Sequence, residues 1–298
     1  MAEKLPIVCM QVRTKKWPGQ TKLKAEDIGL DEDDVAENVV LGHRKLYPDE
    51  WRTRFNSIHQ KAVAFLNKNS LPFILDTVRA VPRMRIDKIV GGLAAFKNQY
   101  MNAVDEFLAD VDNIRVKMLE DFPDTFKPED IPERAKLREK FKMWWLIFEV
   151  KGPDTTQLEQ DELISAYHQA QQEINEKLAQ FVEESVILLR KKISQVVEGL
   201  RDKLTEGKIV KNTSLESVRS VHDWFKELNV FGDKSIDSAL EKLKAALPED
   251  AAFFKGNKEL QTKISELADE VAKKAADLDD LGEITGKYIR VVEVEEAA

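Results

Sequence analysis

The sequence predicts a mainly α-helical protein: an elongated bundle of long antiparallel helices, with a small β-sheet that pairs the N- and C-terminal strands. Charged residues make up 34% of the 298 residues, more than the usual quarter, while only 12 Gly and 10 Pro punctuate the chain. Apolar side chains recur every three or four positions over long stretches, as they do along one face of a helix. These observations favour long, partly solvated helices over many short strands.

Strand-like segments lie at both ends of the chain. Residues 5–13 read LPIVCMQVR, and residues 288–296 read YIRVVEVEE, which alternates between apolar and polar side chains. Such segments are typical of strands, and an isolated strand needs partners. We therefore expect the two ends to pair in one small sheet, with Gly282 and Gly286 releasing the chain from the last helix into its final strand.

Three helical patterns occupy the first half of the chain. The first begins at Pro48 and ends near residue 69, and the second spans residues 84–120. The third runs from Pro132 into MWWLIF, residues 143–148. Six consecutive apolar residues would cover the whole circumference of a helix, so we expect MWWLIF to be buried on all sides.

The longest pattern runs from residue 158 to residue 205, without proline and with one glycine, Gly199. Its apolar positions step by about 3.7 residues if Ser185 fills one of them, nearer to an 11-residue repeat than to a heptad. We expect either one nearly straight helix of roughly 70 Å or two helices that break near Gly199. Thr213 and Glu216 fit a capping box. Shorter helices follow at residues 213–228, 235–247 and 260–278.

We expect a single elongated domain in four parts. They are a strand- and loop-rich segment at 1–47, a long-helix body at 48–206, a short-helix region at 207–257, and a C-terminal helix and strand at 258–298.

Charge and cysteine content limit the compartment and the partners. The net charge of −8 argues against wholesale wrapping of nucleic acid. The single cysteine, Cys9, excludes an internal disulfide and fits a reducing cytoplasm, and the first ten residues lack the features of a signal peptide. We therefore expect a cytoplasmic protein. MWWLIF, the longest apolar run, is far shorter than the roughly 20 residues of a membrane span.

A basic corner near the N-terminus, TKKWPGQTKLK, carries the first candidate site. Pro18 and Gly19 fit the second and third positions of a type II turn, and the segment lacks the Gly-Lys-Ser/Thr ending of a phosphate-binding Walker loop. We expect a plain turn. The alternative is a partner or phosphate contact, made by Lys15, Lys16, Trp17 and Lys22.

The second candidate site is TVRAVPRMRIDKI, residues 77–89, where four cations face a single acid, Asp87. These cations could contact a nucleic-acid backbone or form ion pairs with the acidic residues 31–37 inside the fold. We favour the ion pairs, because the net charge of −8 gives no long-range steering toward nucleic acid. The cations are Arg79, Arg83, Arg85 and Lys88.

Other chemistry finds little support in the sequence. The four histidines are far apart and have no neighbour at metal-ligand spacing. Neither a serine-centred nucleophile elbow nor a dinucleotide-binding fingerprint is present. We therefore expect no catalytic residues, no metal and no cofactor. MWWLIF has a functional alternative to core burial, which is a masked membrane-insertion segment.

Several short runs, taken together, resemble one family. They are WPGxxKL at 17–23, LGHRKL at 41–46, FxxIxxxAxxFL at 55–66, AVP at 80–82, the aromatic and basic stretch at 141–148, TSLESVR at 213–219 and LNVFGD at 228–233. The family is an uncharacterised one of bacterial, phage and mobile-element proteins, classed as a domain of unknown function. The resemblance covers most of the chain. Where the family pattern would have a Gly-Ser-Lys-like triplet, this chain has Gly42-His43-Arg44.

The resemblance implies a context more than a chemistry, because members are often encoded near a MoxR-type AAA+ ATPase and a protein with a von Willebrand A domain. Our first hypothesis is therefore a non-enzymatic helical protein that acts through protein partners, as an adaptor or substrate of such an ATPase pair. Homo-oligomerisation through the long helix is also expected, since its charged faces alternate in sign, as in EINEKLAQFVEES. The alternatives are a nucleic-acid-associated protein that uses residues 79–88 and a membrane-acting helical rod that exposes MWWLIF.

Overall fold

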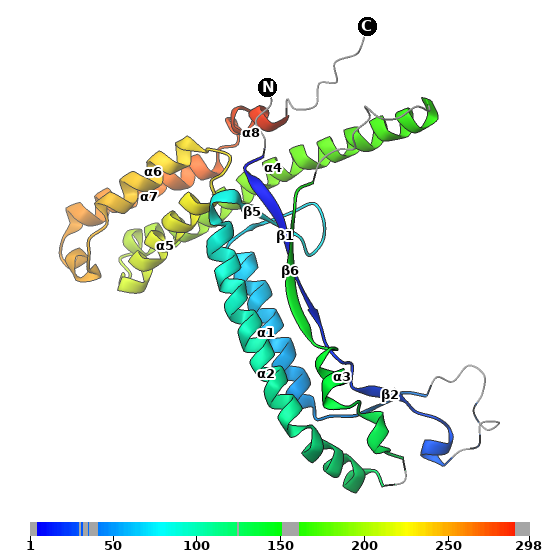
Figure 1. The fold of residues 1–298 in the computed structure, drawn as a ribbon. Helices are drawn as coiled ribbons and strands as arrows, with labels where there is room; N and C mark the ends of the chain where they lie inside the picture. Colours follow the sequence, from blue (N-terminus) through cyan, green and yellow to red (C-terminus); the bar gives the residue numbers. More distant parts are fainter. Residues whose placement is uncertain are drawn as a thin grey trace. The chain divides into compact units, whose positions relative to one another are not determined.

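The computed structural model describes residues 5–29, 31, 35, 41–123, 125–150 and 161–289 (Figure 1). The described residues are mainly helical and include a small antiparallel sheet, which agrees with the predicted class. The chain divides into two compact units, each built from segments that are distant in sequence. Unit 1 draws on Met1–Met10, Asn69–Ile86 and Ile147–Ala298, and unit 2 on Gln11–Lys68 and Asp87–Leu146.

Two helices provide the core of unit 2. They are α1 (Asp49–Lys68) and α2 (Ile86–Asp121), which confirm the first two expected helices. Phe55 of α1 and Phe107 of α2 meet edge to face with ring centroids 5.8 Å apart, and Phe141 packs against them at 5.1 and 5.6 Å. Such aromatic contacts stabilise a core beyond the area they bury.

Two of the family-like runs pair with each other in unit 2. Strand β2 (Gln20–Lys22) lies antiparallel to β3 (His43–Lys45), with Thr21 opposite Arg44. Between them the chain forms a short 3₁₀ helix, η1 (Glu26–Ile28). The runs WPGxxKL and LGHRKL therefore build one local structure, which explains why they occur together.

The larger sheet has the strand order β4-β5-β1-β6, and Figure 1 labels three of these strands, β5, β1 and β6. Ile7 pairs with Pro82 and Met10 with Arg79 in the antiparallel register of β1 and β5, and Leu71 of β4 lies opposite Ala80. The strands are β1 (Ile7–Lys15), β4 (Leu71–Pro72), β5 (Arg79–Pro82) and β6 (Lys142–Phe148).

The expected pairing of the two chain ends is not confirmed. The neighbours of β1 in the sheet are β5 and β6, two internal strands. Gly282 and Gly286 lie inside α8 (Leu281–Ile289), so they do not release the chain into a strand. Residues 290–296, most of the expected final strand, lie outside the described residues.

The prediction that MWWLIF ends a helix is wrong. The expected third helix is a short helix, α3 (Arg134–Arg138), and the apolar run that follows forms β6. Met143 is buried, whereas Leu146 and Ile147 are 46% and 45% exposed, so the run is not buried on all sides. Trp, Ile and Phe favour strands when a neighbouring strand is available, and β1 provides that neighbour.

Unit 1 is organised around α4 (Asp161–Thr205), which is one continuous helix. Gly199 lies within it and is exposed, so the alternative of a break at this residue is wrong. Ser185 is buried in the apolar stripe, as its predicted register requires. The buried residues of α4 from Phe181 to Leu204 join one core with those of the later helices. These are α5 (Asn212–Leu228), α6 (Lys234–Ala246), α7 (Lys258–Ala276) and α8.

The start of α5 differs from its prediction. Lys211 is the N-cap residue and makes no side-chain cap, so Thr213 lies inside the first turn and does not form the expected capping box with Glu216. Instead Glu216 accepts a hydrogen bond from Arg219 at 2.7 Å. The helix is held by its buried face rather than by its cap, as most helices in folded proteins are.

Candidate interaction surfaces

The arginines of the second candidate site are largely engaged within unit 1. Nε of Arg79 donates to Oγ of Ser70 at 3.1 Å, and burial lowers the pKa of this guanidinium. Arg85 is 5% exposed and forms an ion pair with Glu227 at 2.6 Å. Its Nη2 also donates to Oδ1 of Asn69 at 2.9 Å. These two arginines hold segments of the fold together.

The other two cations of this candidate site are exposed. Arg83 forms an ion pair with Glu149 at 2.6 Å. Lys88 lies on α2 and belongs to unit 2, whereas the three arginines belong to unit 1. The acids found opposite the arginines are therefore Glu149 and Glu227. Most of the expected partner segment, residues 31–37, lies outside the described residues.

The Trp-Pro-Gly corner is built around a buried tryptophan. Trp17 is 6% exposed and stacks on Tyr47 with ring centroids 5.5 Å apart, and the Tyr47 hydroxyl donates to the Trp17 carbonyl at 3.3 Å. Gly19 has φ of +55°, the left-handed region that a type II turn requires at this position. A β-carbon on Gly19 would lie 1.8 Å from Cε1 of Tyr47. The corner is thus packed into the core of unit 2.

The lysines of the corner are exposed, and Arg52 of α1 lies beside them, since its Nη2 donates to the Pro18 carbonyl at 3.2 Å. Lys16 donates to Oδ1 of Asn56 at 2.5 Å. The pKa of Lys16 is lowered, mainly by burial and to a smaller extent by the nearby positive charge of Arg52. Lys15 and Lys22 are exposed at opposite ends of the corner. Trp17 is not accessible to a partner. A contact by the three lysines stays a prediction.

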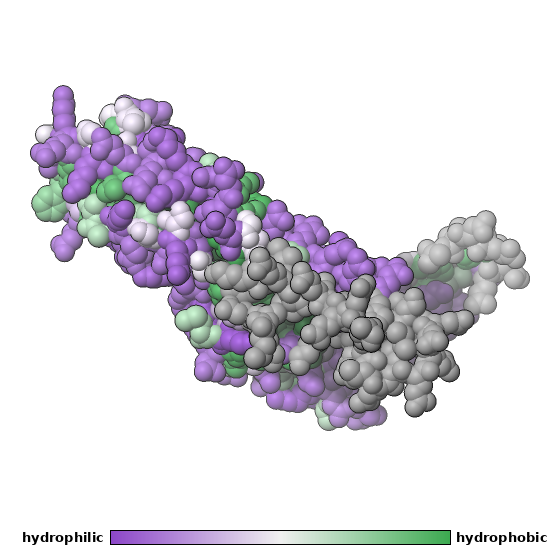
Figure 2. Space-filling view, turned by 90° about the horizontal axis from the view of Figure 1, so that it is seen from above, coloured by the Kyte–Doolittle hydropathy of each residue, from purple (hydrophilic) through white to green (hydrophobic). Residues whose placement is uncertain are grey.

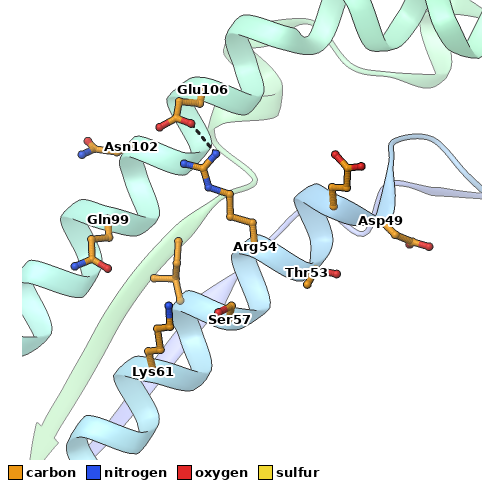
Figure 3. A pocket seen from close by; sticks show the side chains of 10 residues that line it. Asp49, Thr53, Arg54, Ser57, Lys61, Gln99, Asn102 and Glu106 are labelled. Carbon is orange, nitrogen blue, oxygen red and sulfur yellow. Dashed lines mark ion pairs between the residues drawn. The ribbon is translucent and has the colours of Figure 1, made fainter.

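A polar groove of about 860 Å³ runs between α1 and α2 in unit 2 (Figure 3). Arg54 of α1 forms an ion pair across the groove with Glu106 of α2 at 2.6 Å, while Asp49 forms an ion pair with Lys45 at 2.5 Å. These hydrogen bonds lower the pKa of both carboxyl groups. A general acid or base works best with a pKa near the operating pH, so neither carboxylate is suited to proton transfer at neutral pH.

A second groove, of about 470 Å³, lies in unit 1 beyond the end of α4. Gly207, with φ of +67°, ends the helix: the Lys208 amide donates to the Lys203 carbonyl at 2.8 Å and the Gly207 amide to the Leu204 carbonyl at 3.4 Å. This is the Schellman arrangement. It turns residues 207–210 toward the segment that precedes α7.

The opposite wall of this groove is a 3₁₀ helix, η5 (Ala251–Phe254). Asp250 caps it by accepting from the Ala252 amide at 2.7 Å. Asn212, the first residue of α5, ties the two walls together: its Oδ1 accepts from the Ala251 amide at 2.7 Å, and its Nδ2 donates to Asp250 at 3.4 Å. The side-chain hydrogen bonds of Asn212 therefore hold the two walls of the groove together.

Two large apolar side chains are exposed on the segments that form this groove. Ile209, which lines it, is 84% exposed, and Phe253 of η5 is 62% exposed. Figure 2 shows that hydrophobic residues reach the surface as patches among mostly hydrophilic ones. We call the groove with Phe253 the apolar groove. Its lining is Leu204, Gly207, Lys208, Ile209, Val210, Ala251, Ala252, Phe254, Lys255 and Gln261.

Sequence reasoning missed the apolar groove. Its residues come from two segments about 40 positions apart in the printed sequence, 204–210 and 251–261. Exposed single apolar residues such as Ile209 and Phe253 are common on protein surfaces, so the sequence gives no signal that they meet. The nearest hint is FF in the turn AAFFKGN, which would otherwise be a polar stretch.

Metal, thiol and membrane chemistry gain no support from the structure. Within the described ranges, no group of three or more potential His, Cys, Asp or Glu ligands lies together. Cys9 is buried, and this burial raises the pKa of its thiol to about 11, so it is a poor nucleophile. Over the same part of the chain, every helix is too short or too polar to cross a bilayer.

The chain was compared with models of known protein families. Residues 5–247 match the model described as "Protein of unknown function (DUF3150)". The chain belongs to the DUF3150 family. Each of the short runs that carried the resemblance, from residue 17 to residue 233, lies within the matched DUF3150 region. Searches of curated proteins and of solved structures found no match.

Proposed function

We propose that this DUF3150 protein is a non-enzymatic, cytoplasmic interaction protein that acts through protein partners. The observation that carries the proposal is the apolar groove of unit 1, with Ile209 and Phe253 exposed beside it. Binding energy at protein interfaces concentrates in a few large side chains that fill pockets. A concave apolar site flanked by two such side chains has the features of a docking point for another protein.

Charge at the groove adds selectivity. Its lining includes Lys208 and Lys255 and no carboxylate, although the chain as a whole carries a net charge of −8. Glu206 neutralises Lys208 at 2.5 Å, so the charge available to a partner is that of Lys255, which is exposed after the end of η5. Complementary charge steers and orients a partner more than it tightens binding. We infer a partner segment that combines apolar anchors with acidic residues.

The partner we propose is an AAA+ ATPase of the MoxR type, acting with a von Willebrand A-domain protein. This rests on the resemblance described above, in which family members of phage and mobile-element context are encoded near such a pair. An adaptor or substrate of an ATPase needs an exposed recognition surface rather than a catalytic centre. The apolar groove can provide that surface.

The nucleic-acid alternative is less well supported. A phosphate-binding face needs cations that are free to replace counterions. Arg85 is buried in an ion pair with Glu227, and Arg79 is bonded to Ser70. Arg83 is the exposed arginine of the three, and Glu149 already neutralises it.

The test is an affinity capture from host lysate, with and without ATP and with and without nuclease, read by mass spectrometry. The variant is Ile209→Ser/Phe253→Ser. The matched control is Leu75→Ser/Leu278→Ser, which removes two exposed apolar side chains of unit 1 that do not line the groove. We expect an ATP-sensitive, nuclease-resistant AAA+ partner that the control retains and the groove variant loses by about tenfold. Equal retention by both variants would contradict the role of the groove, and recovery of nucleic acid in place of protein would contradict the function.

A further inference from the structure

The apolar stripe of α4 continues toward the N-terminal end of the helix, beyond the buried core of unit 1. Among the residues of α4 from 169 onward, whose burial the structure describes, Phe181 is the first that is buried. Ile174 and Leu178 are half-buried, and they precede Phe181 by seven and three positions. Because residues three, four and seven apart lie on one face of a helix, the stripe that packs into the core continues beyond the core.

Side-chain bonds along the helix hold this segment in shape. Gln169 donates to Glu173 at 3.1 Å, one turn along, and Gln172 donates in the same way to Glu176 at 3.2 Å. Polar pairs at this spacing stabilise a helix that lacks a packed neighbour. The segment from residue 169 to residue 180, called here the α4 arm, is therefore an ordered helical surface.

Charges flank the stripe on one side. At about 100° per residue, Glu173 and Lys177 lie roughly 100° and 60° to the same side of Ile174, whereas Glu176 lies on the far face. Glu173 and Lys177 are both exposed. The same flank thus carries one negative and one positive group, a single turn apart.

We propose that the α4 arm pairs with the α4 arm of a second copy, antiparallel and about a two-fold axis near Asn175. In such a pair the same flank of both helices meets, so Glu173 of each copy faces Lys177 of the other. Ile174 and Leu178 of the two copies pack against each other, and both ion pairs lie along one side of this apolar contact. The helix complements itself in charge and in apolar surface, which favours a second copy over an unrelated partner.

This pairing adds to the proposed function, because it names one partner, but it uses a different surface. The α4 arm and the apolar groove lie at opposite ends of α4. Each arm provides only about three to four helical turns, so the buried area is below that of a standard stable interface. We therefore expect a reversible dimer that forms in the micromolar range.

The charge pattern gives a sharp test by analytical ultracentrifugation of the full chain over a concentration series. Glu173→Lys and Lys177→Glu each place like charges opposite one another, and we expect each to weaken dimerisation by about tenfold. The double variant Glu173→Lys/Lys177→Glu restores opposite charges and should restore the dimer. Glu176→Lys makes the same charge change on the far face, so it is the matched control and should leave the dimer unchanged.

Disulfide trapping tests the register. At about 1.5 Å per residue, the two copies of position 174 lie roughly 3 Å apart along the axis, and those of position 170 roughly 15 Å apart. Ile174→Cys should therefore crosslink under oxidation, and Ala170→Cys should not, because a disulfide spans only about 4.4–6.8 Å between Cα atoms. The native Cys9 is buried and does not interfere.

Several results would overturn the proposal. They are a monomer up to the high micromolar range, a dimer that neither single charge reversal weakens, and equal crosslinking at positions 170 and 174. The Lys177→Glu variant separates failure of the dimer from failure of the proposed function. It should still capture the AAA+ partner, because that capture depends on the apolar groove and not on the α4 arm.

Discussion

The most informative stability experiment concerns Arg190, a charged residue in the core of unit 1. Arg190 lies on α4 with 1% of its side chain exposed. Its Nε donates to Asp233 at 2.8 Å, its Nη2 donates to Asp280 at 2.9 Å, and its Nη1 donates to the Asp277 carbonyl. One guanidinium therefore joins α4 to the start of α6 and to the segment before α8.

The expected cost of removing Arg190 follows from its partners. Asp233 is 2% exposed and also caps α6, since it accepts from the Ile236 amide at 3.1 Å. Arg190→Met would leave this carboxylate buried without a cation, and loss of one partner of a buried ion pair costs about 3–5 kcal/mol. The lost ion pair with Asp280 adds less to this cost, because the Asp280 side chain is 35% exposed and water can solvate it.

The assay is urea unfolding of Arg190→Met, followed by far-UV circular dichroism and by tryptophan fluorescence. The double variant Arg190→Met/Asp233→Asn removes the buried charge but keeps an N-cap, because Asn caps helices as well as Asp. We expect it to recover about 1–3 kcal/mol of the loss, which is the usual range for an uncompensated buried polar group. A single variant that loses less than about 1 kcal/mol, the usual value of an exposed pair, would refute the reasoning that this buried pair holds unit 1 together.

Two further predictions follow from the backbone and from the surface charges. Gly19→Ala should lower the free energy of unfolding by more than about 1 kcal/mol, because φ at this position is +55° and the new β-carbon meets Tyr47. Gly199→Ala lies in open space on α4 and should raise the free energy of unfolding by about 0.4–1 kcal/mol. Thermal melts of both variants check this, and equal shifts in melting temperature would contradict it. Hydrogen bonds from Lys244 and Lys226 lower the pKa of Asp223 and Glu241 below their ordinary values of 3.8 and 4.5. The stability that these carboxylates contribute is therefore present above their ordinary pKa values and is lost as the pH falls through the lowered pKa values of the folded protein. Melting temperatures should thus fall on acidification below about pH 4.5. A melting temperature that stays constant down to pH 3 would argue against these pairs.

The helical part of the fold was predictable because its signal is local. Each amphipathic helix repeats its apolar side chains at the helical period, and burial then follows the stripe. Ser185 shows how far this holds: a hydroxyl stands in the stripe of α4 and is nevertheless buried at the expected register. The continuity of α4 through Gly199 has the same cause, because the flanking turns pack on both sides of an exposed glycine that costs the helix only about 1 kcal/mol.

The interaction surfaces depend on contacts that the sequence does not encode locally. The apolar groove exists because Asn212 bonds to residues 250 and 251, which brings the loop after α4 against η5. The engagement of Arg85 with Glu227 likewise joins positions that are distant in the chain. Sequence reasoning could identify these arginines as a cluster, but their availability to a ligand depends on which acids the fold brings near them.

The sheet shows why short apolar runs resist prediction. MWWLIF has no periodicity, so it fits a buried helix and a strand equally well until a neighbour is known. The neighbour is β1, whose other side is occupied by β5, residues 79–82. The run RAVP of β5 ends in a proline, which a strand tolerates at its end and not in its middle. Residues 79–82 and 142–148 lie on either side of β1, so both of its partner strands come from the interior of the chain, and the local pattern of residues 5–13 does not show which segments these are.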